Sequence, residues 1–327
     1  MKIGLPRALV HYYYYPLWKK LFQQLGAEVV VSDVTTGRLI EKGIKVTASE
    51  LCVPIKIFNA HIINLLEKGV DYCFVPRFVS TDGREWYCPK FLGLPALAQY
   101  SIPNLEKKLL VCDIRGTRED TCELKNYMPL CDILLVTKKQ LKAALNEAKR
   151  YFEKFRTLCR EGYAIDEAET ILAGGRVPPP DSKPSITIGV MGYVYNVYDK
   201  FVSMDIINRL RKSGIGVKTF EMMDERDLEN KKDSGIKPLF WTFTRKIYNA
   251  AKLLIEGKKV DGIIHVTAFA CGPDSVIGKM LEIDCEKENV PFMTIRVDEH
   301  SGENHLQTRI EAFCDMLIRK KSQGVVS

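Results

Sequence analysis

Long apolar runs are missing from this 327-residue sequence, and the longest, such as residues 133–136, have the length of a β-strand rather than of a membrane span. Residues 1–6 lack the charged and apolar regions of a secretory signal, so we expect a cytoplasmic protein without membrane association. Neither a GxxxxGK(S/T) phosphate loop nor a GxGxxG turn is present. Binding of ATP or NAD through the usual phosphate cradles is therefore not expected.

A strong excess of charge of one sign is also absent. The 48 Lys and Arg residues and 41 Asp and Glu residues leave a net charge of +7, and the basic residues are scattered. No basic stripe interleaved with aromatic residues is present, so nucleic-acid binding is not expected. The lysine excess is typical of a solvated surface. The alternative is docking of an acidic partner or of a phosphate-bearing ligand such as coenzyme A.

The sequence does contain an internal repeat. Residues 56–60 (Lys-Ile-Phe-Asn-Ala) return as residues 246–250 (Lys-Ile-Tyr-Asn-Ala). The segments that open the two halves, residues 2–4 and 187–189, match in the same order, and a Tyr-rich stretch follows each. A chain of this length suits two domains, so we expect two similar domains related by internal duplication.

Apolar strand-like runs alternate with amphipathic helical runs in both halves. This alternation predicts an α/β fold of two Rossmann- or flavodoxin-like domains with parallel sheets, covered by helices on both faces. Strands are expected near residues 2–5, 28–32, 70–75, 109–114, 133–137, 186–191, 217–221, 262–266 and 292–297. Helices are expected near residues 15–25, 54–67, 138–159, 165–173, 200–212, 245–255, 274–288 and 306–321.

The clearest linker is residues 175–184, because its three successive prolines cannot continue a helix or a strand ladder. We therefore predict an N-terminal α/β domain over residues 1–174, with a helical extension at 138–174. The C-terminal α/β domain then covers residues 185–327.

Ten cysteines without a secretory signal indicate a reducing compartment, in which thiols stay free or bind metal. Cys88 and Cys271 each stand next to a proline turn, in the loop that follows corresponding strands of the two halves. Cys52 precedes the helix opened by Pro54, and its counterpart in the repeat is Thr242. Each cysteine comes just before a helix, where the positive helix end stabilises a thiolate. We expect the three sulfurs to form a metal site in the interdomain cleft.

The metal could be zinc or an iron–sulfur cluster, since several thiolates suit both. Zinc would require a fourth ligand, for which His61, His265 and His300 are candidates. However, His61 lies a turn or more beyond Cys52, and His265 falls within an expected strand. A [4Fe–4S] cluster held by three cysteines leaves one iron open to water or substrate, which suits a cleft better. The other cysteines carry no partner signal, and Cys73 and Cys112 are expected in the core.

Two further segments could contribute to a site. The polar loop 296–303 (Arg-Val-Asp-Glu-His-Ser-Gly-Glu) follows the last expected strand, and its Glu299, His300 and Glu303 are candidates for proton transfer. The alternative is a polar loop that caps the final helix. The aromatic cluster at residues 12–18 and the tyrosines at 193–198 are expected to pack in the core or between domains, or else to line a substrate cleft.

Several motifs together resemble a family described as related to activases of 2-hydroxyacyl-CoA dehydratases. They are residues 2–8 (Lys-Ile-Gly-Leu-Pro-Arg-Ala), 52–54 (Cys-Val-Pro), 87–89 (Tyr-Cys-Pro), 93–95 (Gly-Leu-Pro), 240–243 (Phe-Trp-Thr-Phe), 260–265 (Val-Asp-Gly-Ile-Ile-His), 269–275 (Phe-Ala-Cys-Gly-Pro-Asp-Ser) and 296–303. Many relatives carry this region fused to an ATPase of the sugar-kinase, Hsp70 and actin fold. The Gly-rich phosphate motifs of that module are absent here. The resemblance therefore indicates a stand-alone partner of the ATPase.

The wider group includes the iron–sulfur subunits of 2-hydroxyacyl-CoA dehydratases and of benzoyl-CoA reductase-type enzymes. The resemblance implies Cys52, Cys88 and Cys271 as ligands of a [4Fe–4S] cluster that a separate ATP-dependent activator reduces. It predicts low-potential electron transfer, or reductive radical chemistry on an acyl-CoA or another small molecule, with a homodimer as a plausible assembly. One alternative is a non-catalytic accessory module that docks the activator or matures a cluster. Another is a zinc-stabilised α/β protein.

Overall fold

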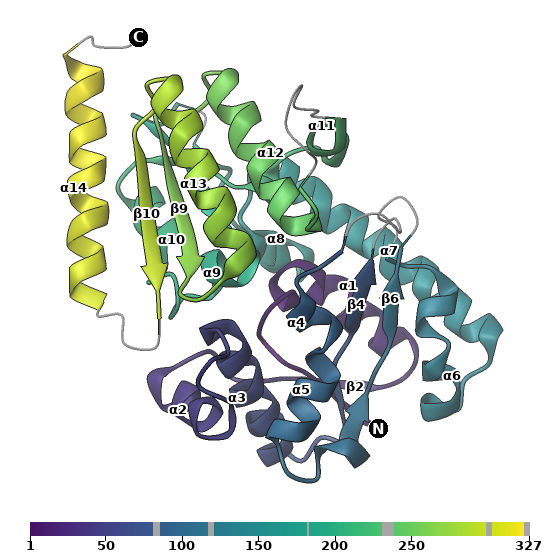
Figure 1. Ribbon diagram of the computed structural model, residues 1–327. Helices are drawn as coiled ribbons and strands as arrows, with labels where there is room; N and C mark the ends of the chain where they lie inside the picture. Colours follow the sequence, from purple (N-terminus) through teal and green to yellow (C-terminus); the bar gives the residue numbers. More distant parts are fainter. Residues whose placement is uncertain (81–85, 117–120, 182, 231–238, 299–302, 324–327) are drawn as a thin grey trace. The chain divides into compact units, whose positions relative to one another are not determined.

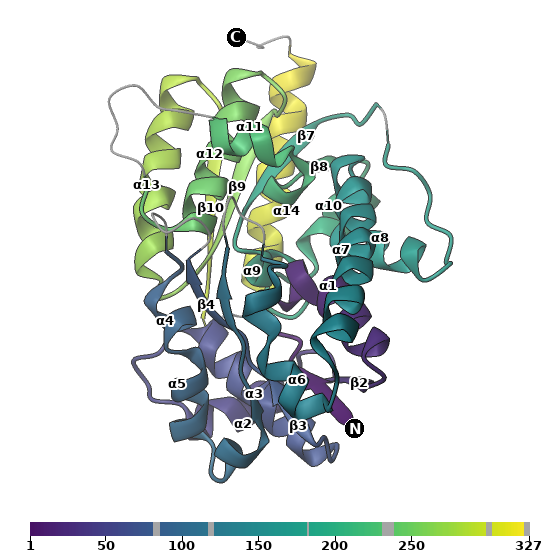
Figure 2. The same ribbon diagram turned by 90° about the vertical axis from the view of Figure 1, so that its right-hand side faces the viewer.

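The structure, a computed structural model, describes residues 1–80, 86–116, 121–181, 183–230, 239–298 and 303–323 (Figures 1 and 2). Contacts divide the chain into two compact units. Unit 1 comprises Met1–Phe155 and Phe240–Thr242, and unit 2 comprises Arg156–Leu239 and Phe243–Ser327. Residues Phe240–Thr242 therefore group with unit 1, although the chain on both sides of them belongs to unit 2.

Unit 1 is built on a parallel sheet with the strand order β2-β1-β3-β5. Its strands are β1 (Lys2–Leu5), β2 (Glu28–Val31), β3 (Tyr72–Phe74) and β5 (Leu109–Leu110), with a separate parallel pair, β4 (Arg77–Ser80) and β6 (Asp113–Arg115). The central strands are short and apolar, and Ile3, Leu5, Cys73 and Phe74 are buried. Such strands fit a sheet that helices cover on both faces.

The helices of unit 1 are α1 (His11–Gln24), α2 (Gly37–Val46), α3 (Val53–Glu67), α4 (Pro89–Leu92), α5 (Leu94–Ser101) and α6 (Pro129–Leu134), with 3-10 turns η1 (Leu105–Lys108) and η2 (Leu124–Tyr127). The long helix α7 (Lys138–Arg160) crosses the boundary between the units. Helix α3 is buried nearly all round, and α2 packs so closely on it that a Cβ at Gly43 would lie 1.9 Å from the Lys56 carbonyl oxygen. The aromatic rings of Tyr14, Trp18 and Phe78 pack together in the core.

Unit 2 is built on a parallel sheet with the strand order β10-β9-β7-β8. Its strands are β7 (Thr187–Gly192), β8 (Gly216–Lys218), β9 (Gly262–Ala268) and β10 (Phe292–Val297). Strand β9 is an inner strand, and all of its residues are buried. When the strands of each four-stranded sheet are numbered in chain order, both sheets have the order second, first, third, fourth.

The helices of unit 2 are α8 (Ile165–Leu172), α9 (Val194–Tyr198), α10 (Ile206–Lys212), α11 (Glu225–Asn230), α12 (Thr242–Glu256), α13 (Gly272–Lys287) and α14 (Glu303–Ser322), with the 3-10 turn η3 (Phe220–Met222). Helices α12 and α13 lie side by side in both views (Figures 1 and 2), and Tyr248 Oη donates to Asp284 Oδ2 between them at 2.7 Å. On β9, a Cβ at Gly262 would meet Phe313 and Leu317 of α14.

The predicted parallel α/β organisation is confirmed in both units, whereas several boundaries differ. The predicted strand at 133–137 is wrong, because Pro129 opens α6 and the left-handed Leu135 (φ 55°) ends it. The expected strand at 109–114 divides into β5 and β6, and the expected helix at 200–212 begins only at Ile206. The two strand errors come from reading a short apolar run by its pattern alone. The helix starts late because Met204 and Asp205 adopt the left-handed conformation.

Among the described residues, no helix combines the length and the apolar character that crossing a membrane requires. The predicted domain limits at residues 174 and 185 stay a prediction, as does the origin of the two units by duplication.

Candidate thiol site

Each of the three cysteines predicted as ligands stands at the N-cap of a helix. Cys52 precedes α3, Cys88 precedes α4 and Cys271 precedes α13, and a proline follows within the first turn in every case. All three residues are partly exposed. The free amide groups of a helix start favour negative charge, and they favour it most at the long helices α3 and α13. Each of the three cysteines thus stands at a helix start that carries free backbone amides.

Cys52 and Cys88 lie within electrostatic range of each other in unit 1. Burial raises the pKa of the Cys88 thiol, and the charge of Cys52 raises it further. The backbone amide and the side-chain charge of Lys90 act in the opposite direction. An anion at one sulfur thus opposes an anion at the other. A bound cation would remove this conflict, because it attracts both thiolates.

A short strand-like contact holds the residues just before Cys88. Trp86 N donates to Phe240 O at 3.1 Å, and Thr242 N donates to Trp86 O at 3.0 Å. Trp86 also forms an antiparallel bridge to Ser80. The side chains of Trp86 and Phe240 are 37% and 55% exposed, so this contact presents aromatic surface to solvent. The sequence resemblance marked both segments, but nothing in their pattern predicted that they pair.

The sequence pattern assigned no role to two buried lysines, Lys56 and Lys246. Lys56 lies on α3, the helix capped by Cys52, and its repeat counterpart Lys246 lies on α12; each is 5% exposed. Lys246 has Glu225 at 3.8 Å. Their position in the repeated Lys-Ile-Phe/Tyr-Asn-Ala motif was the available signal. A buried positive charge on the helix that begins at Cys52 favours anions near that helix.

Cys271 follows a tight turn in unit 2. Its backbone amide donates to Ala268 O at 3.2 Å, and Ala270 adopts the left-handed conformation (φ 62°). The turn leaves Phe269 exposed at the carboxyl end of β9. Ligands of open α/β sheets bind beyond this end of the strands, so Cys271 has the position that the sequence predicted within its own sheet.

The histidines considered as zinc ligands are bonded elsewhere. His61 Nε2 lies 3.0 Å from Thr35 Oγ1, and burial lowers the pKa of His61 to about 3. His265 is buried, as predicted, and its Nε2 lies 2.9 Å from Asp274 Oδ1. Both imidazoles therefore form buried hydrogen bonds within their own units.

Of the other predicted residues, some are confirmed and some lie outside the part of the chain that the structure describes. Cys73 and Cys112 are fully buried, as predicted, and burial raises the pKa of both thiols to about 12. Glu299 and His300 lie outside the described residues, and of Glu303 only its backbone place at the start of α14 is described. Within the described part of the chain, no group of three or more His, Cys, Asp or Glu side chains is arranged to hold a metal ion. Of the three cysteines predicted as ligands, two, Cys52 and Cys88, belong to unit 1.

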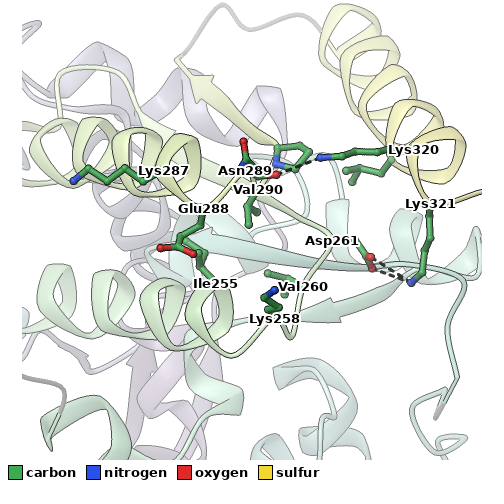
Figure 3. Close-up of a pocket in the computed structure, with 12 residues that line it drawn as sticks. Ile255, Lys258, Val260, Asp261, Lys287, Glu288, Asn289, Val290, Lys320 and Lys321 are labelled. Atoms are coloured by element: carbon green, nitrogen blue, oxygen red, sulfur yellow. Dashed lines mark hydrogen bonds and ion pairs between the residues drawn. The ribbon is translucent and has the colours of Figure 1, made fainter. Parts of the chain in front are cut away.

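A separate pocket of about 290 Å³ lies at the other end of the unit 2 sheet, where β9 and β10 begin (Figure 3). Lys258, Lys287, Lys320 and Lys321 line it. Lys320 Nζ donates to Asn289 O at 3.2 Å, and Lys321 Nζ lies 3.2 Å from Asp261 Oδ1 (Figure 3). Lysines near helix C-termini complement the negative helix ends, so a structural role accounts for them.

Comparison with known proteins corrects the predicted role. The sequence model of the CoA enzyme activase uncharacterised domain (DUF2229) matches residues 2–223. A search of curated proteins found no match. The prediction of a [4Fe–4S] dehydratase-type component for electron transfer or radical chemistry is wrong, because the matched family is a CoA enzyme activase domain and not a dehydratase component. Since residues 2–223 are most of the sequence, the chain belongs to the CoA enzyme activase uncharacterised domain family.

Proposed function

We propose that this protein is a non-catalytic accessory module that docks an ATP-dependent activator of a CoA enzyme. The match of residues 2–223 to the activase domain family carries this proposal. The sequence holds no phosphate loop of its own, so ATP hydrolysis is assigned to the partner. The partner is an ATPase of the sugar-kinase, Hsp70 and actin fold, and the CoA enzyme that it activates is the further partner.

Exposed aromatic side chains support a docking role for unit 1. Trp86 and Phe240 are large and partly exposed, and a backbone hydrogen bond from Trp86 N to Phe240 O holds them together. Aromatic residues of this kind often supply the binding energy of protein interfaces, because they bury a large area at little cost in side-chain entropy.

The thiols are the second part of the proposal. Cys52 and Cys88 of unit 1 bind a metal centre, and Cys271 of unit 2 stays a predicted ligand. The helix starts at both residues, and the electrostatic effect of Cys52 on Cys88 that places the two within range of each other, support this assignment. An iron–sulfur cluster and a zinc ion both fit thiolate ligands, and the chemistry of the bound metal distinguishes them.

The two units are proposed to descend from one duplicated domain. Their sheets have the same strand order. The buried pair Lys56 and Asn59 of α3 recurs as Lys246 and Asn249 of α12. These likenesses of sequence, strand order and burial support the proposed duplication.

A binding and turnover experiment tests the docking role. The purified chain is titrated into an ATPase activator of the stated fold, with ADP or ATP present, and both binding heat and ATPase rate are measured. We expect saturable binding and a change in ATPase rate, both weakened in Trp86→Ala. Tyr100→Ala, which alters an exposed aromatic residue elsewhere in unit 1, is the matched control. Absence of binding in every nucleotide state would refute the proposal.

Metal analysis tests the thiol site independently. Protein purified without oxygen is analysed for iron, sulfide and zinc. Cys52→Ser and Cys88→Ser should each lose metal, whereas Cys131→Ser, a partly exposed cysteine of α6, should retain it. Unchanged metal content in both site variants would show that these sulfurs are not ligands.

A further inference from the structure

A buried polar pair lies directly behind Cys271. His265 lies in the middle of β9, and its Nε2 forms a hydrogen bond with Oδ1 of Asp274 at 2.9 Å; the two residues are 1% and 0% exposed. The bond ties the first turn of α13, which starts after Cys271, to an inner strand of the sheet (Figure 1).

Asp274 is the third residue of α13, where a carboxylate commonly turns back to cap the first amides of the helix. Here the side chain turns inward to the strand instead. Cys271 has no carboxylate cap from this position, and its own carbonyl accepts from Ser275 N at 3.0 Å and from Ser275 Oγ at 2.7 Å. The inward turn of Asp274 therefore serves the contact with His265 rather than the helix end.

Helix α13 is shaped to accept the imidazole. A Cβ at Gly278 would lie 2.9 Å from both Cε1 and Nδ1 of His265. A glycine inside a helix is destabilising relative to alanine, so its presence needs a reason. The ring of His265 supplies that reason, because only glycine lets the helix pass so close to it.

Burial of this polar pair is less favourable than an apolar core would be. His265 Nδ1, Asp274 Oδ2 and Thr267 Oγ1 are buried and have no hydrogen-bond partner among the described residues. Each such atom loses its hydrogen bonds to water on folding and gains none in return, and apolar side chains of similar volume would avoid that loss. The cluster is therefore better explained by what it positions than by the stability it gives.

We propose that His265 and Asp274 are positioning residues that hold Cys271 in place at the start of α13. The turn between β9 and α13 is tight, with a left-handed Ala270, so a displacement of the first turn moves Cys271 directly. This inference deepens the thiol site proposed above and rests on Cys271 belonging to it. Its test uses the metal-free thiol alone, so it can fail while the docking role stands.

Peptide-resolved alkylation measures the position of the thiol. The reaction is run on reduced, metal-free protein at pH 9.5, where an ordinary thiol with a pKa of about 8.5 is mostly ionised and the rate reports access. The variants are His265→Ala, Asp274→Ala, their double and Asp274→Asn. Cys131 in unit 1 and the buried Cys285 further along α13 serve as internal references in the same samples.

We expect Cys271 to react severalfold faster in both alanine variants, while Cys131 and Cys285 keep their rates. The double variant should be no faster than the faster single variant, because both changes remove one bond. Asp274→Asn should stay close to the original rate, since its amide oxygen accepts the same hydrogen bond. Unchanged Cys271 rates in the alanine variants, or additive effects in the double variant, would overturn the proposal.

Faster reaction of Cys131 and Cys285 would reveal that the alanine variants unfold. In that case a pair of glycine variants tests the proposal. Gly278→Ala forces the imidazole aside, whereas a Cβ at Gly272 of the same helix would meet nothing within 4 Å. Hydrogen exchange of the first-turn amides of α13 should become faster in Gly278→Ala and should not in Gly272→Ala. Equal exchange in the two variants would also overturn the proposal.

Discussion

The backbone amide of Lys2 donates a hydrogen bond to the carboxylate of Asp71 at 2.6 Å. In unit 2, the amide of Thr187 donates to Asp261 at 2.7 Å. Each aspartate amide donates in return, Asp71 to the Lys2 carbonyl and Asp261 to the Thr187 carbonyl. In both units, the residue before the third strand thus fixes the start of the first strand.

Removal of this carboxylate should destabilise the protein. Asp71→Ala is expected to lower the free energy of unfolding by about 1 kcal/mol, because the lost bond is charge-assisted but exposed. Asp71→Asn keeps an acceptor and should lose less. Urea unfolding measures both, with Glu28→Ala as control, since the exposed Lys2–Glu28 pair at 3.9 Å should contribute little. An Asp71→Ala protein as stable as the control would contradict this account.

Acid should weaken unit 1 well above the pH at which carboxylates protonate. Burial lowers the pKa of His61 to about 3 and lowers the pKa of His11 well below its ordinary 6.5. Between pH 6.5 and 3 the unfolded chain therefore binds more protons than the folded one, and stability falls as the pH falls. The slope should be about 1.4 kcal/mol per pH unit for each such histidine.

Urea unfolding at pH 7.5, 6 and 5 measures this slope. His61→Gln should flatten it, because the replacement does not titrate, and Lys42→Gln at an exposed pair with Glu67 should leave it unchanged. A His61→Gln protein with the original pH dependence would show that this imidazole is not the cause.

Replacement of one thiol should alter the titration of the other. In reduced, metal-free protein, Cys52→Ser is expected to lower the pKa of Cys88, since Cys52 is one of the groups that raise it. The rate of Cys88 alkylation as a function of pH reports this pKa. Cys131→Ser should not change the pH dependence of Cys88 alkylation. If Cys52→Ser did not change it either, the two sulfurs would be too far apart to share a metal ion.

The close approach of α2 to α3 predicts a large effect of a single methyl group. Gly43→Ala would bring a Cβ within 1.9 Å of the Lys56 carbonyl oxygen, so the helices must separate. We expect a loss of about 1–3 kcal/mol, typical of overpacking, measured by urea unfolding. At Gly93 the nearest atom to a Cβ would be 3.6 Å away, so Gly93→Ala serves as the matched control. Equal stability of the two variants would contradict the packing described.

The sequence predicted what local pattern and chain order determine. The alternation of apolar strand-like and helical runs predicted the parallel sheets. The prolines that follow Cys52, Cys88 and Cys271 predicted that each cysteine precedes a helix. The pairing of His265 with Asp274 could not be predicted, because it depends on how α13 packs across β9. The role of the chain was mistaken because the cysteines resemble those of the iron–sulfur enzymes, whereas the domain family is that of the activases.

The assignment of Phe240–Thr242 to unit 1 has a practical consequence for anyone who dissects the protein. The polypeptide passes between the units at Phe155, before Phe240 and after Thr242, so no single cut yields two complete halves. A fragment that ends at Phe155 would leave Trp86 without its backbone partners Phe240 and Thr242. Supplying a peptide that contains these residues in trans would be the way to restore that fragment.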